Sequence, residues 1–134
     1  MIFEFARIND AKELEEIDKI GNKELANWLP NKKNDFIRLI RNKLIIVAKE
    51  NNKVVGYLSL RPDKESKWLW VEDVYVIKNW RKKGISKLLI RELIKYKNKE
   101  FPKRKLVLLT TGKNVKIFKK LGFKKTLNFM EHKK

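Results

Sequence analysis

The N-terminal third of the chain passes from an alternating to a helical pattern of apolar residues. Residues 2–8 (IFEFARI) alternate in character, which predicts a strand. Asn9 or Asp10 can cap a following helix, and Glu13 stands three positions after Asp10, the spacing of a capping box. The apolar stripe of this helix comprises Leu14, Ile17 and Ile20. Gly21 follows the stripe and predicts that the helix ends there.

Strand signals dominate the middle of the chain. They follow a second short helix whose apolar face holds Phe36, Leu39 and Ile40. Residues 44–50 (LIIVAKE) and 53–60 (KVVGYLSL) flank the pair Asn51–Asn52, which tolerates positive φ, so this segment predicts a β-hairpin. Residues 68–77 (WLWVEDVYVI) are rich in β-branched and aromatic residues and predict a third, longer strand.

The apolar period becomes helical again after Gly84. One side of this predicted helix carries Ile85, Leu88, Leu89, Leu93 and Tyr96, and another side carries Lys87, Arg91 and Lys95. Pro102 breaks the pattern, and residues 105–110 (KLVLLT) are apolar enough to predict a short buried strand of the parallel type.

The C-terminal residues predict one more helix and one more strand. Residues 115–121 form a short helical pattern that Gly122 closes, and residues 123–130 (FKKTLNFM) predict a last strand. The resulting order, β-α-α-β-β-β-α-β-α-β, predicts an α/β (α+β) domain. Its sheet is mainly antiparallel and has a β-α-β crossover near its end.

Composition narrows the class of protein. A chain of 134 residues suits a single domain over residues 1–134, and an apolar content of 43% argues against disorder. No apolar run is long enough to cross a membrane, and the first ten residues do not have the pattern of a secretory signal. The absence of cysteine excludes disulfides, thiolate metal sites and a cysteine nucleophile. We expect a cytoplasmic protein that binds no metal.

The formal net charge of +18 predicts attraction to polyanions such as nucleic acid, a phosphorylated cofactor or an acidic surface. Because the cations are spread over the whole chain, a solvated lysine-rich surface explains the same number. The charge therefore favours a class of partner without indicating any chemistry.

Three cations and a glycine gather where the strand of residues 68–77 gives way to a helix. Arg81, Lys82 and Lys83 precede Gly84, and the helix begins at about Ile85. Free N–H groups and the dipole of a helix start attract anions, and glycine lets the backbone approach an oxygen closely. Physical chemistry thus predicts a phosphate site, although a solvent-exposed basic turn is an equal alternative.

Two other phosphate-binding motifs are excluded. A Walker A loop needs a glycine five residues before its Gly-Lys pair, but Val107 stands there before Gly112–Lys113, and Asn114 replaces the Ser or Thr. A dinucleotide fingerprint needs three spaced glycines, of which this turn has only Gly84.

The same turn resembles a known cofactor motif. Arg81-Lys82-Lys83-Gly84-Ile85-Ser86, after Val74-Tyr75-Val76, is similar to the acetyl-CoA motif of the Gcn5-related N-acetyltransferases (GNAT), Arg/Gln-x-x-Gly-x-Gly/Ala. Residues 117–123 (IFKKLGF) resemble the family's second marker, lYeklGF, and the order of elements matches over almost the whole chain. The resemblance implies a GNAT-like fold and an acetyl-CoA-dependent N-acetyltransferase that moves an acetyl group to a primary amine in a ternary complex.

The resemblance also implies how acetyl-CoA is held. Backbone groups of Val74 to Val76, with Tyr75 between them, pair with the pantetheine arm like an added strand. The amides around Lys82 to Ser86, together with Arg81, hold the pyrophosphate. The sequence departs from the family at Ser86, where Gly or Ala is usual, and a hydroxyl there is small enough to fit and able to donate to a phosphate.

Two adjacent carboxylates, Glu72 and Asp73, interrupt the apolar strand before this turn. Neighbouring residues on a strand point to opposite faces. The pair is explained either by an exposed strand end that offsets lysines or by one carboxylate that takes the proton of an amine nucleophile, whose pKa is near ~10. The segment VEDVYV resembles polyamine acetyltransferases of the family. That resemblance implies a glutamate that assists deprotonation and an aspartate that faces the substrate.

Three further positions bear on the reaction. Phe118 stands where many relatives have a tyrosine that protonates the leaving thiolate, so water, another side chain or no group at all must serve. Thr111 stands where relatives often have an asparagine that contacts the cofactor, and Asn114 follows one turn later. Either residue can contact CoA or cap the following helix. Ser86 as a hydrolase nucleophile is disfavoured, because the only histidine, His132, lies in a basic tail.

A rival hypothesis is a catalytically weak or inactive basic module with the same fold. The lysines that would face nucleic-acid phosphates or an acidic partner are Lys116, Lys119, Lys120, Lys124 and Lys125. On the enzyme hypothesis, the acceptor is a small-molecule amine or a protein or peptide amine. Its site would border the N-terminal helices around residues 28–36. The sequence leaves the oligomeric state open, a homodimer included.

Overall fold

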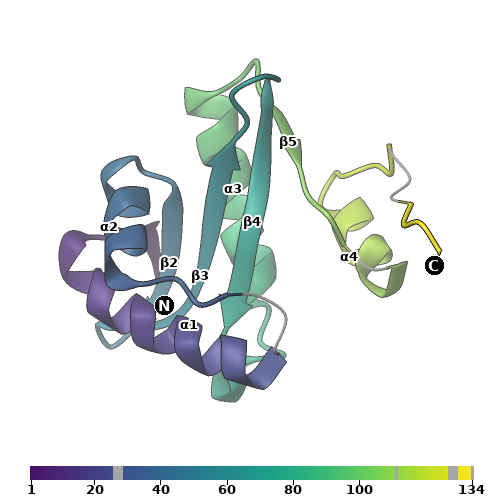
Figure 1. Ribbon diagram of the computed structural model, residues 1–134. Coiled ribbons are helices and arrows are strands. Elements are labelled where there is room, and N and C mark those ends of the chain that lie inside the picture. The colour runs from purple at the N-terminus through teal and green to yellow at the C-terminus, as the bar shows by residue number, and fades with distance from the viewer. Residues whose placement is uncertain (26–28, 111, 127–129, 134) are drawn as a thin grey trace.

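A computed structural model describes residues 1–25, 29–110, 112–126 and 130–133 (Figure 1). Its strands are β1 (Ile2–Phe5), β2 (Ile45–Glu50), β3 (Lys53–Pro62), β4 (Trp68–Val76) and β5 (Lys105–Val107). Its helices are α1 (Ala11–Leu25), α2 (Lys33–Arg41), α3 (Ile85–Glu100) and α4 (Val115–Lys120), with short 3-10 turns at Ile8–Asp10, Lys78–Trp80 and Gly112–Asn114. None of the described helices is both long and apolar enough to cross a membrane.

The five strands form one sheet in the order β1-β2-β3-β4-β5. Neighbouring strands from β1 to β4 are antiparallel, whereas β5 runs parallel to β4 after the crossover through α3. Asn51 and Asn52 both adopt positive φ in the turn between β2 and β3, as the hairpin prediction requires. The predicted mixed α/β class and crossover are therefore confirmed.

Helices cover both faces of the sheet (Figure 1). The helices α1 and α2 lie on one face, and α3 lies behind the other. The core on the first face is built around Leu14, Phe36, Val47 and Tyr57, which are almost fully buried. The core on the second face holds Leu58, Leu69, Leu89 and Leu93. Because strand side chains alternate between faces, β2, β3 and β4 contribute to both cores.

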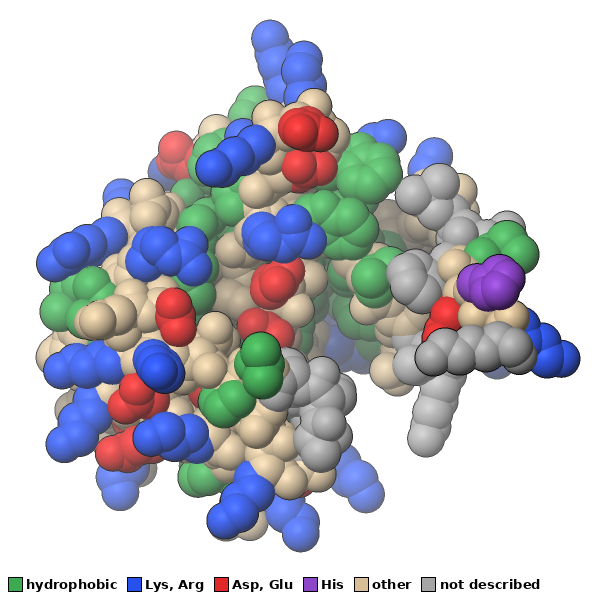
Figure 2. Space-filling view, viewed as in Figure 1, with side chains coloured by type: hydrophobic (Ala, Val, Ile, Leu, Met, Phe, Trp, Pro, Cys, Tyr) green, Lys and Arg blue, Asp and Glu red, His purple; other side chains and the backbone are tan. Residues whose placement is uncertain are grey.

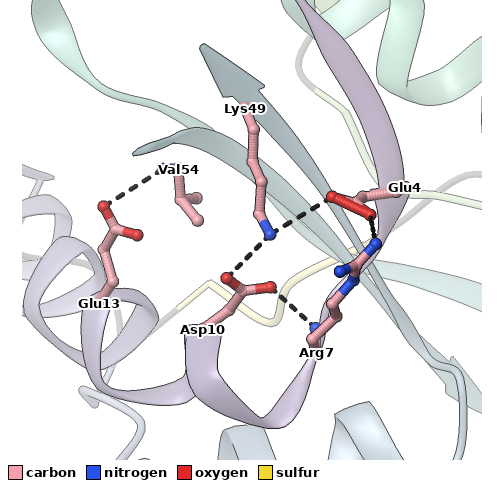
Figure 3. A network of polar contacts seen from close by, with 6 residues as sticks. All are labelled: Glu4, Arg7, Asp10, Glu13, Lys49 and Val54. Carbon is pink, nitrogen blue, oxygen red and sulfur yellow. Dashed lines mark hydrogen bonds and ion pairs between the residues drawn. The ribbon is translucent and has the colours of Figure 1, made fainter. Parts of the chain in front are cut away.

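The start of α1 differs from the predicted capping box. The Asp10 carboxylate reaches back to accept the backbone N–H of Arg7 at 2.8 Å, and it pairs with Lys49 Nζ at 3.0 Å (Figure 3). The Glu13 side chain points away from its own helix and accepts the backbone N–H of Val54 at 3.2 Å. The predicted Asp10–Glu13 reciprocity was wrong because both carboxylates are used to join the helix start to other segments.

Gly21 does not end α1, which continues to Leu25. A Cβ atom at Gly21 would lie 2.8 Å from the ring of Tyr75, closer than non-bonded carbon atoms approach. The glycine is therefore a packing residue inside the helix, where it lets the ring lie directly against the backbone. Sequence alone does not distinguish this use from a helix stop.

We expect Gly21→Ala to destabilise the fold by up to about 2 kcal/mol. Overfilling a packed core usually costs about 1–3 kcal/mol, and alanine recovers roughly 1 kcal/mol of this cost as the better helix former. Urea unfolding measures the difference. The control is Lys19→Ala, which changes an exposed position of the same helix. A Gly21→Ala midpoint equal to or above that of the wild type would contradict this packing role.

The C-terminal strands are shorter than the sequence predicts. Of the strand expected over residues 105–110, only Lys105 to Val107 pair with β4. Residues 123–126 and 130–133 form no strand, and residues 127–129 of the expected last strand lie outside the described residues. The segment after Val107 turns away from β4 toward α4 (Figure 1), so its leucines have a different role from strand pairing.

Candidate active site

The strands β4 and β5 part just beyond their last pair, Trp70 with Val107. On its other side β4 contains a bulge, because Ser59 pairs with Asp73 and Leu60 with Val71, which leaves Glu72 without a cross-strand partner. An extra residue in one strand bends that strand and re-aims its side chains. The bulge therefore lies at the point where the sheet opens.

A cavity of about 410 Å³ lies at this opening. Its wall combines Val71, Glu72 and Val74 of β4, Ser86, Lys87 and Ile90 of α3, Leu108, Leu109 and Thr110 after β5, and Asn114, Ile117, Phe118 and Leu121 around α4. Val74 is 38% exposed although both residues that follow it are buried. A mostly apolar cleft with a few polar groups is the usual form of a small-molecule site.

The turn beside the cavity has the geometry of an anion cradle. Lys82 and Gly84 both adopt positive φ (64° and 78°), and Gly84 is the N-cap residue of α3 without a side-chain cap. The first amides of a helix have no partner within that helix, and a helix of this length presents the positive end of its dipole there. No atom lies within 4 Å of a Cβ built at Gly84, so the space in front of the turn is open.

Arg81 contacts groups of β4 and α1 through its guanidinium. Its Nε donates to the carbonyl of Val76 at 2.9 Å, and its guanidinium pairs with Glu24 of α1 and lies 5.4 Å from the Tyr75 ring centroid. The Arg81 hydrogen bond lowers the pKa of Glu24. Arg81 thus ties the turn to the helix on the opposite face of the sheet, and its contact with a pyrophosphate stays a prediction.

The two carboxylates of β4 have different surroundings. Glu72 borders the cavity, is 46% exposed and accepts a hydrogen bond from Arg61 Nε at 2.9 Å. Asp73 accepts the hydroxyl of the buried Ser59 at 3.2 Å and does not border the cavity. Burial raises the pKa of Asp73, and the negative charge of Glu72 adds to that rise. The predicted opposite orientation of the pair fits these contacts.

A third carboxylate, Asp18 of α1, lies fully buried on the face where α1 and α2 cover the sheet. It accepts the hydroxyl of Tyr57 at 2.6 Å and the backbone N–H of Asn31 at 2.7 Å. Burial, with Asp18 adding to it, raises the pKa of Tyr57 strongly, so the phenol stays a donor. These two bonds tie the segment before α2, at Asn31, to α1 and to Tyr57 of β3.

Comparison with known proteins identifies the family. The model of the Acetyltransferase (GNAT) family matches residues 9–123. This chain belongs to the GNAT family of acetyltransferases. Among curated proteins, none is significantly similar to it in sequence.

Solved structures share the fold of this acetyltransferase. A predicted acetyltransferase from Clostridium acetobutylicum, solved with acetyl-CoA, has a TM-score of 0.72 at 18% identity and covers 98% of this chain and 95% of its own. A ribosomal-protein-alanine N-acetyltransferase from Brucella melitensis has a TM-score of 0.70 at 22% identity, covering 91% and 82%. An aminoglycoside acetyltransferase from an uncultured soil metagenomic sample, solved with sisomicin, has a TM-score of 0.66 at 19% identity, covering 99% and 96%.

The structure brings together some of the residues that the sequence of this acetyltransferase singled out. Glu72, Val74, Ser86, Asn114 and Phe118 all border the cavity. Asn114 occupies the N-cap position of α4 without a side-chain capping bond, so the capping alternative is not realised there.

The other predicted residues that the structure describes do not border the cavity. The side chains of Tyr75, Val76 and Ile85 are buried, which leaves only their backbone for a ligand. Lys83 lies with its Nζ 4.6 Å from the Trp80 ring centroid. Thr111 lies outside the described residues, as does Trp28 at the start of the predicted acceptor border.

Sequence reasoning missed much of the wall of the acetyltransferase cavity. The residues missed are Val71, Lys87, Ile90, Leu108, Leu109, Thr110, Ile117 and Leu121. The signal for Leu108 and Leu109 was present but was interpreted as strand pairing, since an apolar run looks the same whether it pairs or lines a cleft.

The raised pKa of Asp73 predicts a pH-dependent cost to stability. A carboxyl that binds its proton more tightly in the folded state stabilises the fold below its unfolded pKa, and this contribution is lost as pH rises through the folded pKa. We therefore expect Asp73→Asn to be more stable than the wild type at pH 7, by about 0.5–2 kcal/mol. The gain should vanish near pH 3, where Asp73 is protonated in both states.

Urea unfolding at the two pH values measures this effect. The control is Asp63→Asn, because hydrogen bonds from Ser66 and Glu65 lower the pKa of Asp63 and the sign is reversed. Asp63→Asn should bring no gain at pH 7. A loss of stability at pH 7 in Asp73→Asn would contradict the assigned direction.

Proposed function

We propose that this acetyltransferase moves the acetyl group of acetyl-CoA to a primary amine, which attacks directly in a ternary complex. The observation that carries the proposal is the cavity between β4 and β5, placed beside the positive-φ turn at the start of α3. The acetyl-CoA in the Clostridium acetobutylicum structure of the same fold supports it.

The chain offers a fitting group for each part of acetyl-CoA. The amides around Lys82 to Ser86 would bind the pyrophosphate, since the turn leaves room at Gly84 and carries exposed cations. Among the described residues, β4 beyond Trp70 pairs only with β3. The backbone of Val74 to Val76, on the side of β4 away from β3, would hydrogen-bond the amides of the pantetheine arm as an added strand does, although the Val76 carbonyl also accepts Arg81 Nε at 2.9 Å.

The proposed chemistry uses Glu72 and the backbone of β4. Acetyl-CoA supplies a thioester that an amine can attack once the amine has lost a proton. Glu72 at the cavity wall would accept that proton, directly or through water, because an alkyl ammonium is protonated at neutral pH. A backbone N–H of the Val74–Val76 segment would stabilise the negative charge that develops on the carbonyl oxygen.

The leaving thiolate needs no tyrosine in this scheme. Phe118 borders the cavity and packs edge-on against Phe123, with ring centroids 5.8 Å apart, so it can shape the site but donates no proton. A thiol with a pKa of ~8.5 leaves tolerably well as an anion near neutral pH. Solvent would then return the proton to sulfur.

Asp73 would face the acceptor from the side of the sheet that α1 and α2 cover. It is held by Ser59 and is half-buried, so a carboxylate there would attract an ammonium group. The acceptor class is a small-molecule, peptide or protein amine. The range is supported by the two fold relatives whose acceptors are an aminoglycoside and a ribosomal-protein alanine.

Calorimetry with acetyl-CoA tests the proposal first, and the wild type should bind one equivalent per chain. Thiol release on a panel of polyamines, aminoglycosides and peptide N-termini would then identify the acceptor. The control cosubstrate is desulfo-CoA, which should bind but release no thiol. Failure of the wild type to bind acetyl-CoA would overturn the proposal.

A further inference from the structure

The net charge of this chain is concentrated in its second half. Residues 1–77 carry 14 Lys and Arg against 13 Asp and Glu, whereas residues 78–134 carry 20 against 3. The cations are spread over the whole chain, but the acids are not spread with them, because only 3 of the 16 Asp and Glu lie in residues 78–134. A genome-wide lysine bias acts on both halves alike and does not explain the difference.

The cations of the second half lie in part along one helix. Arg91, Lys95 and Lys99 recur every four residues on α3 and are exposed, and Lys103 follows in the turn after the helix. We call these four residues the α3 ridge. Successive positions four apart are about 6 Å apart along a helix axis, so the helix presents a regular row of charge. The opposite side of α3 is buried in the core through Leu89 and Leu93.

The cations of the α3 ridge are mostly not paired, although Glu4 and Glu92 line the same hollow as Lys95 and Lys99. Among the described residues of the ridge, only Lys95 forms an ion pair, with Glu92 at 3.4 Å, and the Lys95 side chain is still 76% exposed. By contrast, basic and acidic side chains alternate over the face formed by α1 and α2 (Figure 2). That face uses its carboxylates to hold backbone N–H groups, as Glu15 does for Lys33.

We propose that the α3 ridge docks this enzyme on a nucleic-acid duplex through the phosphate backbone, without reading sequence. A row of evenly spaced cations suits a linear array of phosphates, and such contacts supply essentially all non-specific affinity. None of the four ridge residues lines the acetyl-CoA cavity, to which α3 contributes Ser86, Lys87 and Ile90. Docking and acetyl transfer can therefore be tested independently.

Three other partners fit the surface less well. Single strands are held by stacking on exposed aromatic rings, but Trp80, Tyr96 and Phe101 pack against the core. A membrane surface needs a helix with a free apolar face, and that of α3 is buried except at Leu88, which is 39% exposed. An acidic protein needs aromatic anchors at the centre of its interface, which the described residues of the ridge do not provide.

Fluorescence anisotropy with 20-base-pair RNA and DNA duplexes, from 50 to 200 mM salt, tests the docking. The test variant combines Arg91→Glu, Lys95→Glu and Lys99→Glu. The control combines Lys12→Glu, Lys19→Glu and Lys33→Glu, exposed residues of α1 and α2 that bring the same change in net charge. The ridge variant should bind at least tenfold more weakly, and its log–log salt slope should fall by about 3 units. The control should change binding less than threefold.

Equal weakening in the two variants would show that net charge alone attracts the duplex and would overturn the proposal. So would failure of the wild type to bind duplex at 50 mM salt, or stronger binding to polyglutamate or to phosphatidylserine vesicles. If the Glu variant does not fold, the corresponding triple Gln variant should show the same ranking at a smaller size. Acetyl-CoA calorimetry on the ridge variant should match the wild type, which separates this result from a failure of the proposed enzyme.

Discussion

Gly84→Glu is expected to abolish acetyl-CoA binding, with a loss of at least a hundredfold in affinity by calorimetry. The residue at this position must adopt a φ of 78°, and its Cβ would enter the open space in front of the first amides of α3. A carboxylate there would occupy the proposed pyrophosphate site and repel its charge, where the free N–H groups and the helix dipole favour an anion.

The matched control is Gly122→Glu, because Gly122 also has positive φ, at 95°, and open space around it. It therefore introduces the same charge and a similar backbone strain of roughly 1 kcal/mol, but at a residue that does not border the cavity. Gly84→Ala isolates the effect of the methyl group and should weaken binding less. Equal losses in the two Glu variants would locate the effect in the strain, and unchanged binding in Gly84→Glu would remove the cradle from the site.

The strand–turn–helix segment was predictable because its determinants are local. The apolar run up to Val76, the glycine with positive φ at Gly84 and the helical period from Ile85 all act through neighbouring residues. Chain order then fixed the parallel crossover, since two parallel strands need a connecting element between them. Fold class and the position of the turn follow from this level of information.

Features that depend on distant partners were not predictable. Gly21 does not end its helix. It makes room for the ring of Tyr75, a residue that lies 54 positions later in the sequence. The bulge at Glu72 appears only when β3 supplies its register. Arg81 pairs with the carboxylate of Glu24 on α1, and the helix α2 and the strands β2 to β4 lie between the two residues in the sequence. In each case, the residue type is compatible with two local roles and a tertiary contact selects one.

The cavity wall could not be predicted from local sequence either, because a strand ends earlier than its apolar pattern indicates. Leu108 and Leu109 continue an apolar strand pattern, yet β5 ends at Val107 because β4 bends away at its bulge. Their side chains then border the cavity rather than extend the sheet. The site thus arises in part because the bulge in β4 shortens β5. This effect depends on two strands and cannot be predicted from either segment of the sequence alone.

Glu72→Gln is expected to lower kcat by about 10²–10⁴-fold, the usual contribution of a general base, while acetyl-CoA binding stays unchanged. The amide oxygen of glutamine can still accept the hydrogen bond that Arg61 Nε now donates at 2.9 Å, so the side chain should keep its place. What glutamine cannot do is take a proton from the attacking ammonium. Thiol release with the amine identified by the acceptor panel measures kcat, and calorimetry measures binding.

Asp73→Asn is the matched control for the neighbouring carboxylate. Asp73 accepts a hydrogen bond from Ser59 and does not border the cavity. The asparagine amide of the variant should therefore raise the KM for the amine more than it lowers kcat. Raising the pH supplies more free amine, and the rate of Glu72→Gln should therefore recover in part as pH approaches ~10, the pKa of the acceptor. If Glu72→Gln keeps full turnover at pH 7 and Asp73→Asn loses it, the base is Asp73. The proton then leaves on the side of the sheet covered by α1 and α2, where burial raises the pKa of the Asp73 carboxyl above its usual value.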